Sequence, residues 1–309
     1  MKALQDKIKK LKAERNAVIL AHFYTRPEVQ EVADFLGDSL ALSQKAAKID
    51  APVILFAGVN FMAETAKVLS PEKTILVPNP EAGCSLADSC DAEKFRRYLT
   101  LHPYHTVVSY VNTTVEVKAL TDICCTSSNA LKVVNSIPQR IPILFGPDHN
   151  LGRYVMKNAA RHNILLWQGG CHVHERFTVE AVKSISEQYP AARIMAHPEC
   201  RPEVADLAHF VGSTAEIIEE CRKSAPQSEF IIVTEAGILA TLEREMPDKK
   251  FIPVPSSDGK PLNECEYMKM VTLESIAACL ENMAPEVKID EEVRQAAEGA
   301  IRRMVDIGR

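Results

Sequence analysis

The chain has 309 residues, of which 46% are apolar and 25% are charged, and this composition is ordinary for a folded protein in water. A formal net charge of −5 argues against nucleic acid or a membrane surface as a partner, and no apolar run approaches the roughly 20 residues that span a bilayer. Nine cysteines are many for a protein of a reducing compartment, where metal binding, catalysis or burial explains them better than disulfides.

The first 15 residues predict an amphipathic helix. The segment "MKALQDKIKKLKAER" spaces its apolar residues at helical intervals and lacks the apolar central region of a signal peptide. We therefore expect residues 1–15 to form a covering helix and the protein to be cytoplasmic. Further covering helices are expected over 273–309.

Between these ends, one order of elements occurs three times. Each copy starts with an apolar strand that ends in polar residues: "AVILAHFY", "TVVSYVN" and "RIMAHPE". A helix, a second strand, a second helix and a third strand follow in each copy. The first strand ends are 88 residues apart from His22 to Tyr110 and 87 from Tyr110 to His197. The repeat predicts three units at 16–102, 103–189 and 190–272.

Short, almost continuously apolar strands that alternate with helices indicate parallel sheets with helices on both faces. Ligands of such sheets bind outside the carboxyl ends of the strands. The expected fold class is therefore α/β, with three pseudo-threefold-related three-layer domains and an active site at their shared centre.

Each third strand is followed by a cysteine. Cys84, Cys171 and Cys265 are 87 and 94 residues apart, and the other six cysteines show no such register. Glycines before the first two leave room for a bulky ligand. Three converging thiolates suit a soft metal centre, either zinc with His172 or His174 as a fourth ligand or an iron–sulfur cluster with one open iron. A closed zinc site would leave the central cavity unused, which favours the cluster.

Polar side chains at the other strand ends are expected to line the same cavity. Hydroxyls at helix starts face it as well, where free backbone N–H groups bind phosphates and carboxylates, although such hydroxyls are otherwise simple N-caps. A small, anionic, oxygen-rich substrate is implied. The strand-end residues are His22, Tyr24, Tyr110, Asn112, His197 and Glu199, and the hydroxyls are Ser39, Ser127 and Thr214.

Several of these segments together resemble one known family. The motifs "AHFY", "SYVNT", "CTSSNA", "WQGGCHVHERF", "AHPEC" and "CEYMKM" occur in this order within residues 16–285 and closely resemble bacterial and archaeal quinolinate synthase. The resemblance implies a pseudo-threefold α/β fold that holds a 4Fe-4S cluster. It also implies a transferase or lyase-type condensation of iminoaspartate with dihydroxyacetone phosphate to quinolinate, phosphate and water, in NAD (pyridine nucleotide) biosynthesis.

The resemblance further implies a role for each matched residue. The three cysteines match the family's cluster ligands, and Glu199 is similar to the family's acid/base glutamate. Glu199 can serve in this way if burial and neighbouring anions raise its pKa toward neutrality. The implied partners are the two substrates. Whether the chain also makes a transient contact with the L-aspartate oxidase or dehydrogenase that makes iminoaspartate is left open. The implied catalytic residues are Glu199, Tyr110 and His197, and the implied substrate-binding residues are His22, Tyr24, Ser39, Asn112, Ser127, His197, Glu199 and Thr214.

Two other functions remain open at this point. A radical enzyme of the diphthamide-synthesis type shares the three-domain, three-cysteine plan but cleaves S-adenosylmethionine, and the "AHFY", "SYVN" and "AHPE" strand ends argue against it. An iron–sulfur sensor or carrier needs no general acid, so the ionisable strand ends argue against that as well. Supporting roles for His172 and His174, and phosphate contacts for Arg176, Lys260 and Lys269, are not decided by the sequence.

Overall fold

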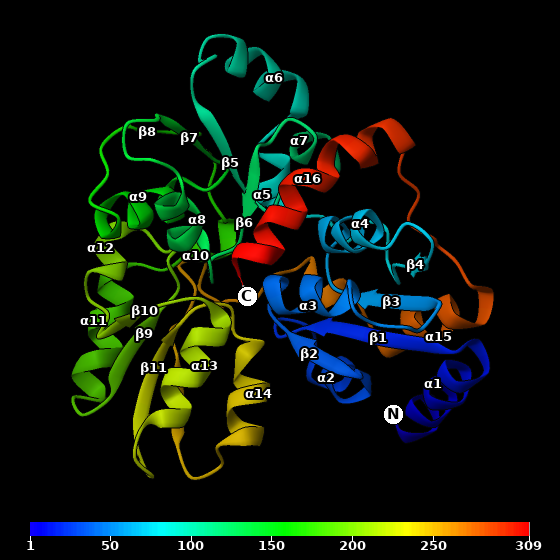
Figure 1. Cartoon of the computed structure of the whole chain (residues 1–309). Coiled ribbons are helices and arrows are strands. Elements are labelled where there is room, and N and C mark those ends of the chain that lie inside the picture. Colours follow the sequence, from blue (N-terminus) through cyan, green and yellow to red (C-terminus); the bar gives the residue numbers. More distant parts are fainter. Residues whose placement is uncertain (309) are drawn as a thin grey trace.

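The computed structural model describes residues 1–308, which form three four-stranded parallel sheets connected by helices (Figure 1). The first sheet has the order β2-β1-β3-β4 and contains β1 (Ala17–His22), β2 (Phe35–Gly37), β3 (Val53–Ala57) and β4 (Thr74–Leu76). The second has the order β6-β5-β7-β8 and contains β5 (Thr106–Tyr110), β6 (Ile123–Cys125), β7 (Ile143–Gly146) and β8 (Ile164–Leu166). The third has the order β10-β9-β11-β12 and contains β9 (Arg193–Ala196), β10 (Phe210–Val211), β11 (Glu229–Val233) and β12 (Lys250–Pro253).

Helices connect the strands and cover the sheets. Those between β1 and β5 are α2 (Pro27–Val32), α3 (Ser39–Ala46), α4 (Asn60–Leu69), α5 (Ser85–Asp88) and α6 (Ala92–Thr100). Those between β5 and β9 are α7 (Val115–Lys118), α8 (Ala130–Ser136), α9 (His149–Asn158), α10 (His172–Glu175) and α11 (Val179–Gln188). The third unit has α12 (Pro202–Ala205), α13 (Thr214–Lys223), α14 (Ile238–Glu245) and a 3-10 turn over Met268–Met270.

Strand residues alternate between two buried layers. In β1, Leu20 packs in the large core toward α3 and α4, whereas Ile19 and Ala21 pack in a second core with Ile8 and Ile276. Side chains that alternate in this way bury both faces of a parallel sheet, which explains the nearly continuous apolar strands. The predicted fold class, three three-layer α/β units with parallel sheets, is confirmed by the three sheets.

The number of strands per unit differs from the prediction. The sequence suggested three strands in each unit, but each sheet contains a fourth: β2, β6 or β10. These strands have only two or three residues, which is too short for a periodic pattern. They form because each pairs in parallel with the first strand of its unit.

The repeat also includes a hydrogen bond that the sequence did not suggest. In each unit, a side chain just before the short edge strand accepts a bond from a backbone N–H near the start of the first strand. Equivalent bonds in three places support a common origin of the units. They run from Ile19 N to Asp34 Oδ2 (2.8 Å), from Val107 N to Asp122 Oδ2 (2.8 Å) and from Ile194 N to His209 Nδ1 (2.9 Å).

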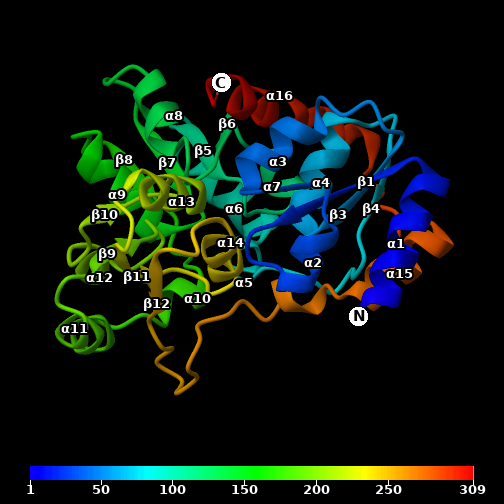
Figure 2. The same ribbon diagram turned by 90° about the horizontal axis from the view of Figure 1, so that it is seen from below.

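The terminal helices lie on the first two units. Helix α1 (Lys2–Arg15) packs on α15 (Leu273–Asn282) at the outer face of the first sheet, as Figure 2 shows from below. Helix α16 (Glu291–Ile307) lies across α4, α7 and β6, drawn in red in Figure 1. Asn129 Nδ2 donates to the Met304 carbonyl at 2.9 Å, which fixes α16 to the loop before α8.

The unit boundaries proposed from the sequence and the cytoplasmic location stay predictions, and Arg309 lies outside the described residues. None of the helices in residues 1–308 combines the length and the apolar character needed to cross a membrane.

Candidate active site

The carboxyl ends of the central strands meet at a cavity that is lined by residues of all three units. It forms there because each unit points the ends of its first strands toward the same centre. All twelve residues that the sequence placed at the site line this cavity: His22, Tyr24, Ser39, Cys84, Tyr110, Asn112, Ser127, Cys171, His197, Glu199, Thr214 and Cys265. Their proximity is therefore a property of the fold, whereas their roles stay predictions.

The three cysteines enter the cavity from equivalent loops. Cys84 and Cys171 immediately precede the short helices α5 and α10, and Cys265 precedes the turn over Met268–Met270. All three are half-buried free thiols. Burial raises the pKa of Cys84 to about 12 and of Cys265 to about 11, and the charge of Cys265 raises the pKa of Cys84 as well. A bound cation is what would stabilise three such thiolates together.

The spacing of the sulfur atoms distinguishes two kinds of metal site. A tetrahedral zinc ion with Zn–S bonds of about 2.3 Å holds its sulfurs about 3.8 Å apart. Among the described residues, the three cysteine sulfurs are not grouped within 4.8 Å of one another. This donor set therefore does not match the close spacing of a single tetrahedral zinc ion, and three thiol donors are the ligand type that iron–sulfur clusters use.

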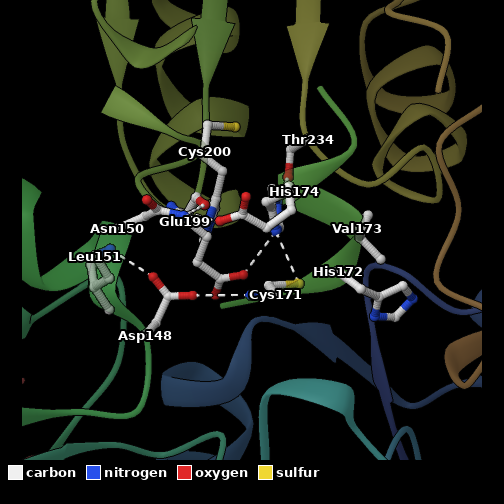
Figure 3. Close-up of polar contacts among 12 residues, drawn as sticks. Asp148, Asn150, Leu151, Cys171, His172, Val173, His174, Glu199, Cys200 and Thr234 are labelled. Carbon is white, nitrogen blue, oxygen red and sulfur yellow. Dashed lines mark hydrogen bonds and ion pairs between the residues drawn. The ribbon is translucent and has the colours of Figure 1, made fainter. Parts of the chain in front are cut away.

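Buried carboxylates hold two of the cysteine segments. Asp148 Oδ2 accepts a bond from the Cys171 backbone N–H at 3.2 Å (Figure 3), and Glu235 Oε1 accepts one from the Cys265 N–H at 2.9 Å. Asp148 and Glu235 are 87 residues apart, and they follow the equivalent strands β7 and β11. The sequence reading missed this pair, although the register of the repeat was enough to find it.

His174 lies at the centre of the polar contacts. Its Nδ1 is 2.8 Å from Glu199 Oε2 and 3.3 Å from Cys171 Sγ, and Figure 3 shows both contacts. The ligand atoms of these three residues all lie within 4.8 Å of one another. His174 is therefore a site residue, which the sequence left undecided.

A chain of hydrogen bonds extends from His174 to the first unit. Thr234 Oγ1 is 2.9 Å from His174 Nε2 and 2.8 Å from the Tyr24 hydroxyl, which is 2.6 Å from Thr214 Oγ1. On the other side of Glu199, the Tyr110 hydroxyl donates to Oε1 at 2.5 Å. Each hydroxyl can both donate and accept, so the chain connects groups from all three units.

Two histidines at equivalent strand ends are held in one tautomer. The backbone N–H of Tyr24 donates to His22 Nδ1 at 3.1 Å, and that of Glu199 donates to His197 Nδ1 at 3.3 Å. Burial lowers the pKa of both imidazoles to about 3, so both are neutral. Because Nδ1 accepts a bond, the proton is on Nε2, and each ring offers an N–H donor to a ligand.

The charge of Glu199 is set by its neighbours as well as by its burial. Burial alone would raise its pKa, but the charge of His174 and the hydrogen bonds from His174 and Tyr110 outweigh it and hold the pKa below its usual range. The condition of a pKa raised toward neutrality is therefore not met in this structure. The burial argument did not include the donors that face the carboxylate.

The hydroxyl residues are not the helix caps. The N-cap of α3 is Asp38 and that of α13 is Ser213, so Ser39 and Thr214 are the first residues inside these helices. Ser127 lies in the turn before α8. Ser39 and Thr214 are thus free of a capping role. Asn112 adds a buried Oδ1 with no partner in the cavity wall, which leaves an acceptor for a ligand donor.

A buried ion pair supports the cavity wall. Lys269 Nζ is 2.9 Å from Glu235 Oε1 and donates to the Tyr24 carbonyl at 2.7 Å. The side chain of Glu235 is 1% exposed and that of Lys269 is 13% exposed. The pair therefore joins the Cys265 segment to the loop that carries Tyr24. The sequence left open whether Lys269 contacts a phosphate, and in the structure Lys269 pairs with Glu235 of the protein itself.

We expect Lys269→Met to lower the free energy of unfolding by about 3 kcal/mol, because it leaves the Glu235 carboxylate buried without its counter-charge. Urea unfolding of metal-free protein measures this. The defect should be larger at pH 8 than at pH 5, because burial raises the pKa of Glu235 and the carboxyl takes up a proton more readily as the pH falls.

A matched control is Lys157→Met. Lys157 pairs with Asp206 at 2.8 Å, but both side chains are more than half exposed. We expect this change to cost less than about 1 kcal/mol. Equal losses for the two variants would contradict the assigned importance of the buried pair.

A family model described as quinolinate synthetase A protein matches residues 6–306. The chain belongs to the quinolinate synthetase A family. Members named quinolinate synthase include that of Rippkaea orientalis, 50% identical over 97% of this chain and 92% of the relative. Those of Prochlorococcus marinus and Prosthecochloris aestuarii are each 49% identical over 99% of this chain, and over 91% and 94% of the relative. Members of the family are enzymes, and so is this chain.

Proposed function

We propose that the chain condenses iminoaspartate with dihydroxyacetone phosphate to give quinolinate, one phosphate and two waters, as a step of NAD biosynthesis. The observation that carries this proposal is the convergence of three cysteines and a buried Glu199–His174–Tyr110 group on one cavity. The names of the relatives support the product.

Cys84, Cys171 and Cys265 would hold a 4Fe-4S cluster, because all three are free thiols that line one cavity and thiolates are the usual ligands of such clusters. When bound, such a cluster supplies a Lewis-acidic iron that polarises a hydroxyl or carbonyl oxygen. The short helices that follow Cys84 and Cys171 hold these residues in place, as do the carboxylates that accept the cysteine N–H bonds.

The polar wall orients the anionic groups of the substrates. His22 and His197 each present a neutral Nε2–H donor, and Ser39, Ser127 and Thr214 present hydroxyls at helix starts. Neutral donors bind carboxylate or phosphate oxygens without needing a buried positive charge. The unpaired Asn112 Oδ1 accepts a bond from an amine or hydroxyl of the substrate.

Glu199 moves the protons. Ring formation removes two waters and shifts several hydrogens between carbon, nitrogen and oxygen, so a base and an acid are both required. Glu199 Oε2, ionised in the resting site, takes the first proton, and Tyr110 holds Oε1 in place. His174, which contacts both Glu199 Oε2 and Thr234 Oγ1, holds the carboxylate in place, and the protonated Glu199 returns its proton to the oxygen that leaves as water.

The activity test uses anaerobically prepared protein with oxaloacetate, ammonia and dihydroxyacetone phosphate. We expect quinolinate and phosphate to appear in equal amounts. S-adenosylmethionine cleavage in place of quinolinate formation would identify a radical enzyme instead. A full cluster with no product from either set of substrates would identify a sensor or carrier.

Removing a hydroxyl from the cavity wall should weaken substrate binding. We expect Ser39→Ala, Ser127→Ala and Thr214→Ala each to raise the dissociation constant about tenfold to hundredfold, because each removes a hydrogen bond to a charged group. Titration with dihydroxyacetone phosphate measures this. Ser136→Ala is the control, because its hydroxyl bonds only to the Val133 carbonyl at the end of α8. Unchanged affinity in the three variants with intact folds would remove the hydroxyls from the site.

A further inference from the structure

The residues that directly follow the three cysteines are joined to one another. These are Ser85, His172 and Glu266, one from each unit of the repeat. Ser85 Oγ is hydrogen-bonded to His172 Nδ1, and His172 Nε2 is 2.8 Å from Glu266 Oε2. We call this group the latch. It connects three segments that are far apart in the sequence at points one peptide bond from each cysteine.

The latch lies toward solvent from the cysteines. Ser85 and His172 line the cavity, but the His172 side chain is 28% exposed and that of Glu266 is 45% exposed. Figure 3 shows the His172 ring directed away from the group of Cys171, His174 and Glu199. The latch is therefore separate from the contacts assigned to the chemistry.

Further contacts fix the acidic end of the latch. Arg176 Nη2 is 2.9 Å from Glu266 Oε1, and Lys260 Nζ is 3.5 Å from the same oxygen. The ring of Tyr267 contacts the His172 ring edge-on, with centroids 6.0 Å apart. Arg176 and Lys260, which the sequence left open as phosphate contacts, thus face a carboxylate of the protein.

We propose that the latch holds the three cysteine segments together and slows the exchange of the metal group with solvent. The proposal rests on the proposed cluster at Cys84, Cys171 and Cys265. A group bound by three thiolates leaves more readily when the segments that carry them separate. The latch opposes this separation because His172 bonds at both ring nitrogens to neighbours in the other two units.

The test measures loss of iron rather than activity. Wild type, His172→Ala, Ser85→Ala and Glu266→Gln are reconstituted anaerobically, and their iron is then extracted by excess bathophenanthroline disulfonate without substrate. We expect equal iron at the start and release about fivefold to tenfold faster from His172→Ala, which loses both bonds. Ser85→Ala and Glu266→Gln should show smaller increases.

Asp206→Asn is the control, because it breaks the exposed 2.8 Å pair with Lys157 between α9 and α12, away from the cysteines. It should release iron at the wild-type rate. The double variant Ser85→Ala/His172→Ala should be no faster than His172→Ala, because both changes remove the same bond.

The iron measurements separate the cluster proposal from the latch proposal. Wild type without iron overturns the cluster proposal itself. Iron in wild type, with wild-type release from His172→Ala, overturns the latch and leaves the cluster proposal standing. Faster release from Asp206→Asn as well overturns the latch, because general loosening then explains the rates. If His172→Ala fails to fold, Ser85→Ala and Glu266→Gln decide alone, and wild-type release from both overturns the latch.

Discussion

Replacing Cys84, Cys171 or Cys265 with alanine is expected to leave the purified protein with little iron. Each change removes one of three thiolate bonds that would hold the cluster, and the two remaining soft ligands are too few for four irons. The carboxylates that fix the cysteine backbones cannot replace a sulfur, because their oxygens are occupied by backbone N–H bonds. Iron and sulfide analysis of anaerobically prepared variants measures the loss.

Cys90→Ala and Cys279→Ala are matched controls for this prediction. Both thiols are buried and form no disulfide, and neither is among the described residues that line the cavity. We expect both variants to keep their iron and to lose only packing energy. Near-normal iron in the three cavity variants, or loss in the two controls, would show that the metal is held elsewhere.

The second large effect is expected from Glu199→Gln. Glutamine keeps the size of the side chain and an oxygen that can accept the Tyr110 bond, but it cannot take a proton at neutral pH. We therefore expect full iron content, retained substrate binding and a loss of turnover of at least about a hundredfold. Addition of both substrates should produce a lasting spectral change as an intermediate accumulates.

Glu175→Gln provides the control for this change. Glu175 lies on α10 near the cysteine site, but its carboxylate bonds to Asn150 Nδ2 at 2.6 Å and does not line the cavity. Turnover near the wild-type value is expected. If Glu199→Gln also keeps its iron and turns over normally, the acid/base is elsewhere, and Tyr110 or His197 is the next residue to test.

The sequence alone was enough to predict those features of the fold and the site that repeat along the chain. The register of His22, Tyr110 and His197 predicted three parallel sheets and one shared cavity, because equivalent positions of equivalent units meet at a common centre. The same argument selected the three cysteines from nine. The short strands β2, β6 and β10 were missed because their stability comes from pairing and not from their own residues.

Contacts between non-equivalent positions were not predictable in this way. His174 meets Glu199 and Thr234, and these three residues occupy unrelated places in their units. The direction of the pKa shift of Glu199 depends on such contacts, so it could not be derived from burial alone. The segment from Cys171 to Cys265 is longer than the segment from Cys84 to Cys171. It contains Lys260, which contacts Glu266 of the latch and has no counterpart in the other units.

The threefold arrangement within one polypeptide has a consequence for how such a site can arise. Three separate copies of a single unit, assembled around an axis, would place the same side chain at all three first strand ends. Joined in one chain, the ends carry an imidazole, a phenol and another imidazole at His22, Tyr110 and His197. Covalent linkage lets each unit carry a different side chain at this position, and it makes assembly of the cavity independent of protein concentration. A centre that needs several different functional groups around one metal-binding point becomes accessible to a fused chain and not to a symmetric trimer.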